Sequence, residues 1–378
     1  METQAPLPPE YTQAESAELD SRIAAVKNQL GSKLCVLGHH YQRDEVIKFA
    51  DFTGDSLKLS QLAAGQTDAE FIVFCGVHFM AESADIVSSP NQKVVLPNLH
   101  AGCAMAEMAD AEDVAAGLEE ISELADAQVT PISYVNSTAD IKAITARAGG
   151  ACCTSSNVRN VFEWALAPAD KNRPGAGKIF CIPDQHLGRN TAIAMGYGEN
   201  ECCVYDPQLP DGGLTQADVQ RATFILWKGH CYVHQLFRPE HVTSVRESHP
   251  DIRVIVHPEC PREVVELADA SGSTAQIITA IEAADPGTEW AVGTESNLVN
   301  RLAKRHTDKF ICVLNQASAA CTQMCRIDRP HLLWALDGIA NGQIVNQITV
   351  PKETADNARI ALQRMIDIKP VTQVTKNG

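Results

Sequence analysis

The residues best suited to chemistry in this chain are three cysteines that lie far apart in the sequence. Cys103 lies in the segment 97–105, Cys231 in the segment 227–234, and Cys321 begins Cys-Thr-Gln-Met. None of the three belongs to a tight Cys-x-x-Cys pair, which argues against a zinc ribbon or a ferredoxin-type cluster. Three single thiolates brought together by a fold could hold an iron–sulfur cluster by three corners. The fourth iron would stay open to substrate and act as a Lewis acid rather than as an electron carrier.

The other cysteines can be sorted by their neighbours. The chain has thirteen cysteines, and a cytoplasmic protein is not expected to join them in disulfides. Four lie in strand-like apolar runs and are predicted core residues: Cys35, Cys75, Cys181 and Cys312. Cys152-Cys153 and Cys202-Cys203 are adjacent pairs, a poor geometry for two ligands of one cluster. Five ligand candidates remain: Cys103, Cys231, Cys260, Cys321 and Cys325.

Imidazole, phenol and hydroxyl groups gather around the end of the first strand-like run. His39, His40 and Tyr41 follow this run, and Ser56 opens the next helical pattern. Such groups hydrogen-bond carboxylates, and a helix N-terminus favours a bound anion. The alternative is that His39 or His40 only caps the strand end.

A later strand-like run ends in Tyr134-Val135-Asn136-Ser137-Thr138. Because side chains alternate along a strand, Tyr134 and Asn136 would face the same ligand. A turn in which Ser137 or Thr138 is a helix N-cap is the alternative.

Two segments, 154–157 and 272–274, are hydroxyl-rich starts of helices. Ser155, Ser273 and Thr274 in these segments suit phosphate or carboxylate binding, together with the backbone N–H groups. Ordinary N-capping explains each segment equally well.

The segment His257-Pro258-Glu259-Cys260-Pro261 ends a purely apolar run with an imidazole, a carboxylate and a thiol between two prolines. This stiff arrangement suits a general acid/base pair or a metal ligand. The alternative is that Glu259 caps the helix that starts near Pro261. His234, three residues after Cys231, is a further candidate for catalysis. The chain contains neither GxxxxGK[ST] nor GxGxxG, so no motif supports nucleotide binding.

Short apolar runs alternate with helical patterns along the whole chain. The strand-like runs are 33–40, 71–77, 129–136, 178–184, 252–259 and 309–314. The helical patterns are 56–64, 111–124, 139–148, 263–270, 274–284 and 354–366. Unbroken apolar runs are typical of parallel strands covered by helices on both faces, so the sequence predicts an α/β fold built from βαβ units.

The three cysteines divide the chain into comparable blocks, which favours three similar α/β domains around a shared centre. We expect a leader over 1–20, a first domain over 21–103 with 322–378, a second over 104–231 and a third over 232–321. The stretches 168–176 and 207–216 have the composition of surface loops.

Composition excludes several classes of function. The chain has 378 residues, 45% of them hydrophobic, with a formal net charge of −16 and a pI near 5.2. A protein that binds nucleic acid needs a basic face, so the negative net charge of this chain argues against a nucleic-acid partner. The first ten residues lack the basic and apolar regions of a signal peptide, and no apolar run approaches a membrane span of about 18 residues. A cytoplasmic protein that does not contact a membrane is expected.

Taken together, these segments closely resemble the quinolinate synthase family, the iron–sulfur enzymes of bacterial NAD biosynthesis. The resemblance runs from about residue 34 to residue 336. Its ordered motifs are His39-His40-Tyr41-Gln42, Gly54-Asp55-Ser56-Leu57, the Cys103 segment, Tyr134-Val135-Asn136-Ser137, Cys153-Thr154-Ser155-Ser156-Asn157, Pro183-Asp184-Gln185-His186-Leu187-Gly188, Cys231-x-x-His234, His257-Pro258-Glu259-Cys260-Pro261, Gly272-Ser273-Thr274, Gly293-Thr294-Glu295 and Cys321-x-x-Met324.

The resemblance implies a fold, a cofactor and a reaction. The fold would be three αβα sandwich domains with parallel sheets, in a pseudo-threefold arrangement around a central active site. Each domain would give one ligand, Cys103, Cys231 or Cys321, to one 4Fe-4S cluster per chain. The reaction would join iminoaspartate and dihydroxyacetone phosphate into quinolinate with loss of phosphate and water, the open iron acting as Lewis acid.

The resemblance also implies roles for individual residues. The substrate pocket would be lined by His39, Ser56, Tyr134, Asn136, Ser155, His257, Ser273 and Thr274. Glu259 would be the general base, with Tyr41 and His234 as proton-transfer partners. An aspartate-oxidising enzyme would be a transient partner that hands over the unstable imine. The region 168–216 looks long for the core of this family and would be an insertion over the site or at an interface.

Alternatives stay open beside the resemblance. Cys325 or Cys260 could replace a cluster ligand. An iron–sulfur hydro-lyase of another pathway would share the open iron, but such enzymes typically take two ligands from a Cys-x-x-Cys pair. An iron–sulfur redox sensor usually carries a basic DNA-binding helix. The net charge of −16 argues against this alternative. A zinc protein is the last alternative.

Overall fold

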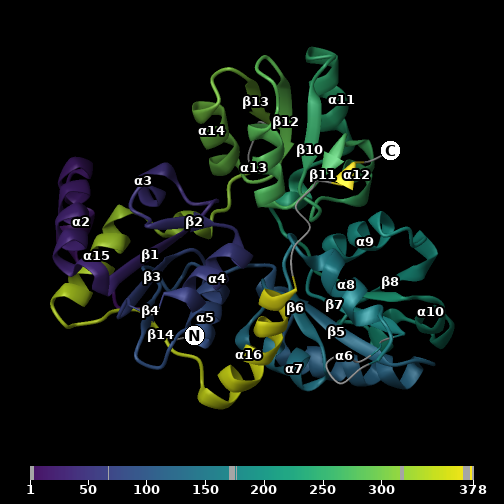
Figure 1. Ribbon diagram of the computed structural model, residues 1–378. Helices are drawn as coiled ribbons and strands as arrows, with labels where there is room; N and C mark the ends of the chain where they lie inside the picture. The colour runs from purple at the N-terminus through teal and green to yellow at the C-terminus, as the bar shows by residue number, and fades with distance from the viewer. Residues whose placement is uncertain are drawn as a thin grey trace. The chain divides into compact units, whose positions relative to one another are not determined.

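The computed structural model describes residues 4–66, 68–169, 175, 177–315, 319–368 and 375–376. Contacts between Cα atoms divide the chain into two compact units, Met1–Cys103 with Cys321–Lys352 and Ala104–Ala320 with Glu353–Gly378. Within the described residues, the strands form three sheets of five strands each, one in the first unit and two in the second (Figure 1).

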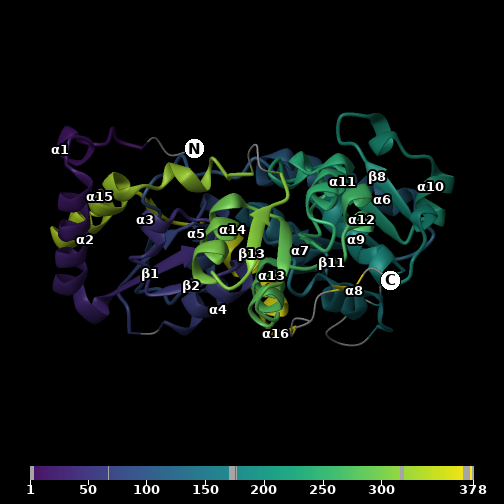
Figure 2. The ribbon, with the colours of Figure 1, turned by 90° about the horizontal axis from the view of Figure 1, so that it is seen from above.

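The sheet of the first unit has the strand order β14-β4-β3-β1-β2. Its strands are β1 (Leu34–His39), β2 (Phe52–Gly54), β3 (Phe71–Cys75), β4 (Lys93–Val95) and β14 (Gln347–Ile348). All neighbours pair in parallel except β14, which is antiparallel to β4. Helices α2 (Ser16–Leu30) and α15 (Arg329–Ala340) pack together on one side of the sheet, and α4 (Ser56–Gly65) and α5 (His78–Val87) pack together on the other (Figures 1 and 2).

The first sheet of the second unit has the order β6-β5-β7-β9-β8, with every pair parallel. Its strands are β5 (Val129–Tyr134), β6 (Ala151–Cys153), β7 (Lys178–Ile182), β8 (Cys202–Tyr205) and β9 (Phe224–Trp227). The helices between them are α6 (Ala111–Leu124), α7 (Ala139–Arg147), α8 (Val158–Leu166), α9 (Gln185–Ala194) and α10 (Gln216–Arg221).

The second sheet of this unit has the order β13-β12-β10-β11-β15. Its strands are β10 (Arg253–Val256), β11 (Ala270–Ser271), β12 (Glu289–Gly293), β13 (Phe310–Val313) and β15 (Thr375–Lys376), the last antiparallel to β11. The helices are α11 (Pro239–Ser248), α12 (Arg262–Leu267), α13 (Thr274–Glu282) and α14 (Ser296–Arg305).

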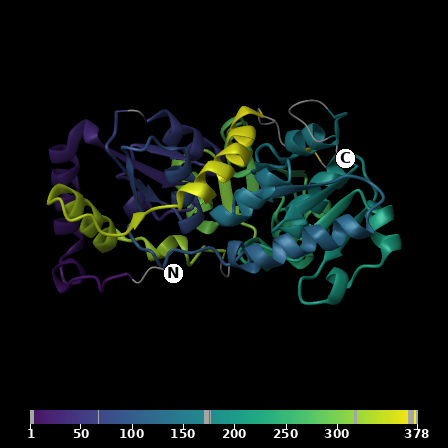
Figure 3. The same ribbon diagram turned by 90° about the horizontal axis from the view of Figure 1, so that it is seen from below.

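Helix α16 (Lys352–Asp367), yellow in Figure 3, belongs mainly to the second unit. Asn157 donates from Nδ2 to the carbonyl oxygen of Met365 at 2.9 Å, and Arg364 donates to the carbonyl oxygen of Gly150. These bonds fix α16 beside the helix that follows β6.

Two features of the sequence produce these elements. Strands β1, β3, β5 and β7 are buried along their whole length, as apolar runs in a covered parallel sheet must be. Several helices that follow a strand begin at a capping side chain: Asp55 accepts from the N–H of Lys58 in α4, and Ser273 from that of Gln276 in α13. The polar segments at the carboxyl ends of the strands are therefore fixed on both sides.

The predicted α/β fold with parallel sheets is confirmed, and the helix predicted over 111–124 has the observed bounds. The helix predicted over 263–270 is wrong at its end, because α12 stops at Leu267. Ala270 and Ser271 instead pair with Ile255 and Val256 of β10 as strand β11. The three-domain division and the pseudo-threefold arrangement stay predictions.

The interpretation of 168–216 as an insertion is wrong for 178–205. This stretch supplies β7, the central strand of its sheet, and the edge strand β8. Residues 170–174 and 176 of the predicted loop lie outside the described residues. The expected leader 1–20 is folded where the structure describes it, since Pro9–Thr12 form helix α1, α2 begins at Ser16, and Tyr11 is buried. None of the described helices has the length and apolar character needed to cross a membrane.

Candidate active site

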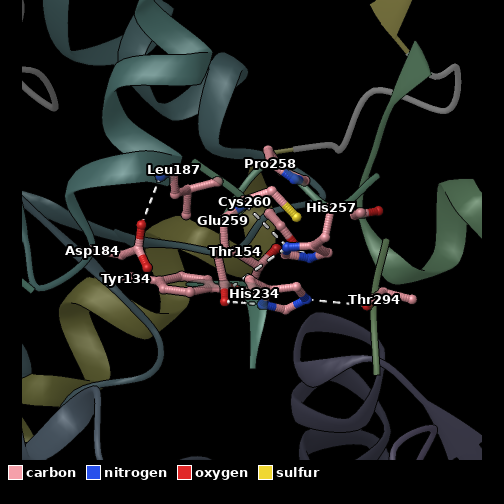
Figure 4. Close-up of polar contacts among 12 residues, drawn as sticks. Tyr134, Thr154, Asp184, Leu187, His234, His257, Pro258, Glu259, Cys260 and Thr294 are labelled. Atoms are coloured by element: carbon pink, nitrogen blue, oxygen red, sulfur yellow. Dashed lines mark hydrogen bonds and ion pairs between the residues drawn. The ribbon is translucent and has the colours of Figure 1, made fainter. Parts of the chain in front are cut away.

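The carboxylate of Glu259 is the centre of a buried hydrogen-bonded cluster in the second unit (Figure 4). Oε1 accepts a hydrogen bond of 2.5 Å from Oη of Tyr134, and Oε2 lies 2.8 Å from Nδ1 of His234. Tyr134 ends β5, His234 starts a 3-10 helix after β9, and Glu259 follows β10. Three strand ends therefore bring a phenol, an imidazole and a carboxylate together, as the carboxyl ends of parallel strands commonly do.

Two imidazoles complete the cluster. The rings of His234 and His257 stack with centroids 4.5 Å apart, and Nε2 of His234 lies 3.1 Å from Oγ1 of Thr294. Nδ1 of His257 accepts from the backbone N–H of Glu259 at 3.3 Å, which assigns the proton of the neutral ring to Nε2. Nε2 of His257 can then donate to Oγ of Ser155 at 3.1 Å.

The electrostatics of the cluster separate the charged from the neutral groups. Burial by itself raises the pKa of Glu259, but His257, His234 and the hydrogen bonds from His234 and Tyr134 outweigh it and lower the pKa to about 2. Burial lowers the pKa of His257 to about 3, although Glu259 opposes this shift. At neutral pH the cluster therefore holds an ionised Glu259 carboxylate beside a neutral His257.

The hydroxyl-rich helix starts face each other next to this cluster. Oγ of Ser156 donates to Oγ of Ser273 at 2.9 Å, and Ser273 is also the N-cap of α13. Thr274, the first residue of α13, is buried, and Ser155 is half-buried. The N-capping alternative is thus confirmed for Ser273, while anion binding by this pair of helix starts stays a prediction.

Asn136 has an amide oxygen that is buried but has no hydrogen-bond partner among the described residues. The turn around it is fixed, because Ser137 donates from Oγ to the carbonyl oxygen of Tyr134 at 2.8 Å and Thr138 caps α7. Lys142 is fully buried and donates to the carbonyl oxygen of Ser137. Thr138 is the N-cap that the alternative named, while the amide oxygen of Asn136 remains available for a ligand that donates a hydrogen bond.

The other predicted pocket residues lie in the first unit. His39 ends β1 and is buried, and its Nδ1 accepts from the backbone N–H of Tyr41 at 3.2 Å. The ring of His39 also meets the ring of Tyr41 edge-on, with centroids 4.7 Å apart. Ser56 is the first residue of α4, after the capping residue Asp55. The shared role of these residues with the second unit stays a prediction.

The three cysteines singled out in the sequence have the same local structure. Each is half-buried and is followed by a turn and a short 3-10 helix that begins three residues later, at Ala106, His234 or Met324. An α-helix begins eight residues after each cysteine: α6 at Ala111, α11 at Pro239 and α15 at Arg329. Each of the three segments thus offers a thiol in an equivalent setting, and a thiol donor is compatible with an iron–sulfur ligand.

Comparisons with known proteins agree with this geometry. The family model described as "NadA: Quinolinate synthetase A protein" matches residues 21–367. The chain is 53% identical to the quinolinate synthase of Streptomyces coelicolor over 353 residues, which are 92% of this chain and 88% of the relative. It is 52% identical to that of Acidobacterium capsulatum over 363 residues (95% of each), and 50% identical to that of Geobacillus thermodenitrificans over 360 residues (95% and 96%). This chain belongs to the quinolinate synthase family.

The resemblance drawn from the sequence is therefore confirmed, and the match extends beyond residues 34–336 at both ends. Members of the quinolinate synthase family are enzymes, so the expectation of an enzyme is confirmed as well.

The two alternative ligands in this member of the quinolinate synthase family lie in different settings. Cys260 is fully buried and its Sγ donates to the carbonyl oxygen of Gly293 at 3.5 Å. Burial and the charge of Glu259 raise the pKa of the Cys260 thiol well above its usual value, which disfavours the thiolate that a ligand needs. Cys325 lies inside the 3-10 helix Met324–Arg326, where the two other segments have Glu107 and Gln235.

Three of the four cysteines predicted to lie in the core are buried. Cys35, Cys75 and Cys181 are buried, and burial raises the pKa of each thiol. Cys312 is half-buried, because β13 is the edge strand of its sheet, so its assignment to the core is wrong.

One group of side chains could also hold a single metal ion. Sγ of Cys231, one imidazole nitrogen of His234 and one carboxylate oxygen of Glu259 lie within 4.8 Å of one another. His234 and Glu259 already share a hydrogen bond, which a metal on those same atoms would displace. This set is what a zinc site would use.

Asp184 is a site residue that the sequence reasoning missed. It is 2% exposed, caps α9 through a 2.7 Å bond from the N–H of Leu187, and has an Oδ2 atom with no hydrogen-bond partner in the described part of the chain. Burial and the charge of Glu259 raise its pKa well above the usual value, although the backbone N–H groups of Leu187, Cys231 and His186 oppose the shift. The motif 183–188 contained this residue, but its position reads as an ordinary helix cap. Thr294 was missed in the same way, within Gly293-Thr294-Glu295.

Proposed function

We propose that this chain makes quinolinate from iminoaspartate and dihydroxyacetone phosphate, with release of phosphate and water. The observation that carries the proposal is the buried Glu259 carboxylate, which is held at 2.5 Å by Tyr134 and at 2.8 Å by His234. Ring formation from these substrates requires repeated removal of protons from carbon, and a dry, oriented carboxylate suits that task. The relatives named quinolinate synthase support the same reaction.

Proton transfer is assigned to the cluster around this carboxylate. Glu259 takes the proton from the substrate carbon. His234, bonded to Glu259 through Nδ1 and to Thr294 through Nε2, moves the proton away, and Tyr134 stabilises the carboxylate. Tyr41 is assigned a second proton-transfer role.

Substrate binding is assigned to the surrounding polar groups. Neutral His257 donates to Ser155, and both are proposed to hold a substrate carboxylate or phosphate oxygen. The N-terminus of α13, with Ser273 and Thr274, adds hydroxyl groups and a helix dipole that favour an anion. Asn136 offers its amide oxygen to a substrate donor. His39 and Ser56 complete the proposed pocket.

A 4Fe-4S cluster is the proposed cofactor, with Cys103, Cys231 and Cys321 as its ligands. Bound there, it would supply a Lewis acid for the loss of water. The support is the shared local structure of the three segments, which Cys325 and Cys260 do not have. NAD biosynthesis follows from the proposed product.

The first experiment is anaerobic purification, followed by an absorption spectrum and a count of iron and sulfide. A brown protein with about four irons per chain supports the cofactor, and quinolinate formed from the two substrates supports the reaction. A colourless protein with one zinc would favour the site of Cys231, His234 and Glu259 instead. Single Cys→Ser variants then test the ligands: a full cluster in Cys321→Ser and its loss in Cys325→Ser would contradict the assignment.

We also propose a cytoplasmic location and a transient protein partner. Thirteen cysteines, of which Cys35, Cys75 and Cys181 are buried thiols with raised pKa values, suit a reducing cytoplasm. Iminoaspartate is unstable, so an aspartate-oxidising enzyme is the proposed transient partner. A pull-down with that enzyme at high concentration that recovers no complex would count against it.

A further inference from the structure

Helix α9 contacts both of the segments that carry the proposed proton-transfer residues. One segment, 229–235, contains Cys231 and His234, and the other, 257–261, contains Glu259. The helix follows β7 in the motif 183–188, to which the proposed reaction gives no role. All these residues belong to the second unit.

The N-terminal end of α9 is bonded to both ends of the segment 229–235. The backbone N–H of Gln185 donates to the carbonyl oxygen of Gly229 at 3.0 Å. Nε2 of His186 lies 2.7 Å from Oε1 of Gln235. A Cβ atom on Gly229 would lie 2.3 Å from the carbonyl oxygen of Pro183, so only glycine allows this close approach. The start of α9 therefore fixes the path of the chain around His234.

Asn190, further along the same helix, is bonded to the backbone on both sides of Glu259. Its Nδ2 donates to the carbonyl oxygen of Pro258 at 2.8 Å and to that of Cys260 at 2.9 Å. The side chain is 4% exposed, so these carbonyl groups could not easily exchange the amide for water. Both donor hydrogens of the amide are used, whereas Oδ1 has no partner among the residues that the structure describes.

We infer that Asn190 is a positioning residue that sets the place of the Glu259 carboxylate relative to His234. The segment 257–261 lies between strand and helix, and its two prolines have no N–H to anchor it. The amide of Asn190 anchors its carbonyl groups instead. Because α9 also fixes 229–235, one rigid helix sets the distance between the base and its imidazole partner. The inference deepens the proposed function, on which the role of Glu259 as base rests.

Two substitutions of Asn190 test the inference. Asn190→Asp keeps the shape but replaces both donors with acceptors that repel the two carbonyl groups. Asn190→Leu removes the donors at similar volume without adding charge, and is the variant to use if Asn190→Asp does not fold. The matched control is Lys178→Met. Lys178 is 5% exposed and donates from Nζ to the carbonyl oxygens of Gln220 and Ala222 at 2.7 and 2.9 Å, at the opposite end of β7 from the site.

The first readout is hydrogen exchange of the full-length protein, purified anaerobically and analysed by mass spectrometry. The amides of Glu259 and Cys260 are bonded to His257, so they exchange only when the segment opens. In the Asn190 variants this exchange should become at least roughly tenfold faster, because both hydrogen bonds that anchor the segment are lost. In Lys178→Met it should stay at the wild-type rate.

The second readout is turnover. A displaced base lowers kcat by about 10- to 100-fold with little change in KM, because binding groups elsewhere are untouched. Unchanged exchange of the Glu259 and Cys260 amides in both Asn190 variants, or equal acceleration in Lys178→Met, would overturn the inference. So would loss of folding in both variants, since that would show a general structural role. A wild-type protein that forms no quinolinate refutes the proposed reaction, and the exchange readout then still decides on Asn190.

Discussion

Two buried carboxyl groups of the second unit, Glu259 after β10 and Asp184 after β7, differ in their charge. Both are at most 3% exposed, and the charge of Glu259 acts on Asp184. Glu259 is held by a phenol and an imidazole, and its pKa is lowered to about 2. Within the described part of the chain Asp184 is held by backbone N–H groups, and burial with the charge of Glu259 raises its pKa well above the usual value.

Both carboxyl groups are buried, yet their pKa values shift in opposite directions. Burial alone therefore does not decide whether a carboxyl group is charged, because the groups around it contribute as well. His257 and His234, together with side-chain donors on both oxygens, keep Glu259 ionised. Asp184 instead has one bonded oxygen and one without a partner among the described residues. Two titratable groups pushed apart in this way commonly mark different chemical roles. Here they separate an ionised carboxylate from a neutral carboxyl group.

The strongest test of the comparison replaces each carboxyl group with its amide. Glu259→Gln should lower kcat by about 10²- to 10⁴-fold, the usual contribution of a general base. Asp184→Asn should lower kcat by less than about tenfold, because a neutral amide resembles the neutral acid that it replaces. Steady-state kinetics of the cluster-loaded protein checks both values. Equal losses would show that the difference in charge does not separate the two roles.

Tyr134→Phe sharpens the comparison by removing one of the donors to Glu259. A hydrogen bond to a charged group contributes about 1.5–3 kcal/mol, so kcat/KM should fall by about 10- to 100-fold. Losing this donor also raises the pKa of Glu259, and the acid limb of the pH–rate profile should move to higher pH. Tyr205→Phe, which removes a bond to Glu120 remote from the cluster, is the control and should leave the acid limb in place.

The neutral state of His257 predicts a pH dependence of stability. The folded pKa of about 3 lies below the ordinary value of 6.5, so the unfolded chain binds this proton first. The free energy of unfolding should therefore fall as the pH drops from 6.5 towards 3, by about 1 kcal/mol per pH unit from this group. Urea unfolding at several pH values measures it. His257→Asn should flatten the dependence, whereas substitution of the surface residue His249 should leave it steep.

The smallest expected effect concerns Asp184. Its raised pKa means that the folded protein keeps a proton which the unfolded chain releases near its ordinary value of about 4. This contribution to stability is complete below that pH and is lost as the pH rises through the folded pKa. Asp184→Asn keeps a neutral group there, so its stability relative to wild type should grow with pH. A constant difference between the two unfolding curves would contradict the assigned direction.

Much of the fold could be predicted from the sequence, because unbroken apolar runs such as 71–77 have few stable alternatives to a covered parallel strand. The polar segments after β1, β5 and β10 could be predicted for the same reason, since they interrupt those runs. Strand β11 could not be predicted: Ala270 favours a helix locally, and only pairing with β10 makes it a strand.

The contacts within the site could not be predicted. Tyr134 and Glu259 are 125 positions apart, and no local pattern shows that they meet. Asp184 has the sequence of an ordinary N-cap, and Asn190 lies inside a helix, where its spacing suggests nothing unusual. The repeated structure after Cys103, Cys231 and Cys321 was also missed. The residues three and six positions after each cysteine are buried, but they differ in type from one segment to the next: Ala106 and Ala109, His234 and Phe237, Met324 and Ile327.

The discontinuity of the first unit has a consequence for synthesis on the ribosome. Helix α15 and strand β14 complete this unit, but they are encoded after nearly all of the second unit. The emerging sheet β4-β3-β1-β2 is therefore incomplete at that stage. Helix α2 lacks its packing partner α15, and strand β4 lacks its neighbour β14. Domains generally fold as units, N-terminal first, during translation. In this chain the second unit can finish its two sheets, apart from β15, while the segment made first is still incomplete. A ribosome stalled before residue 329 would therefore hold an unfinished first unit.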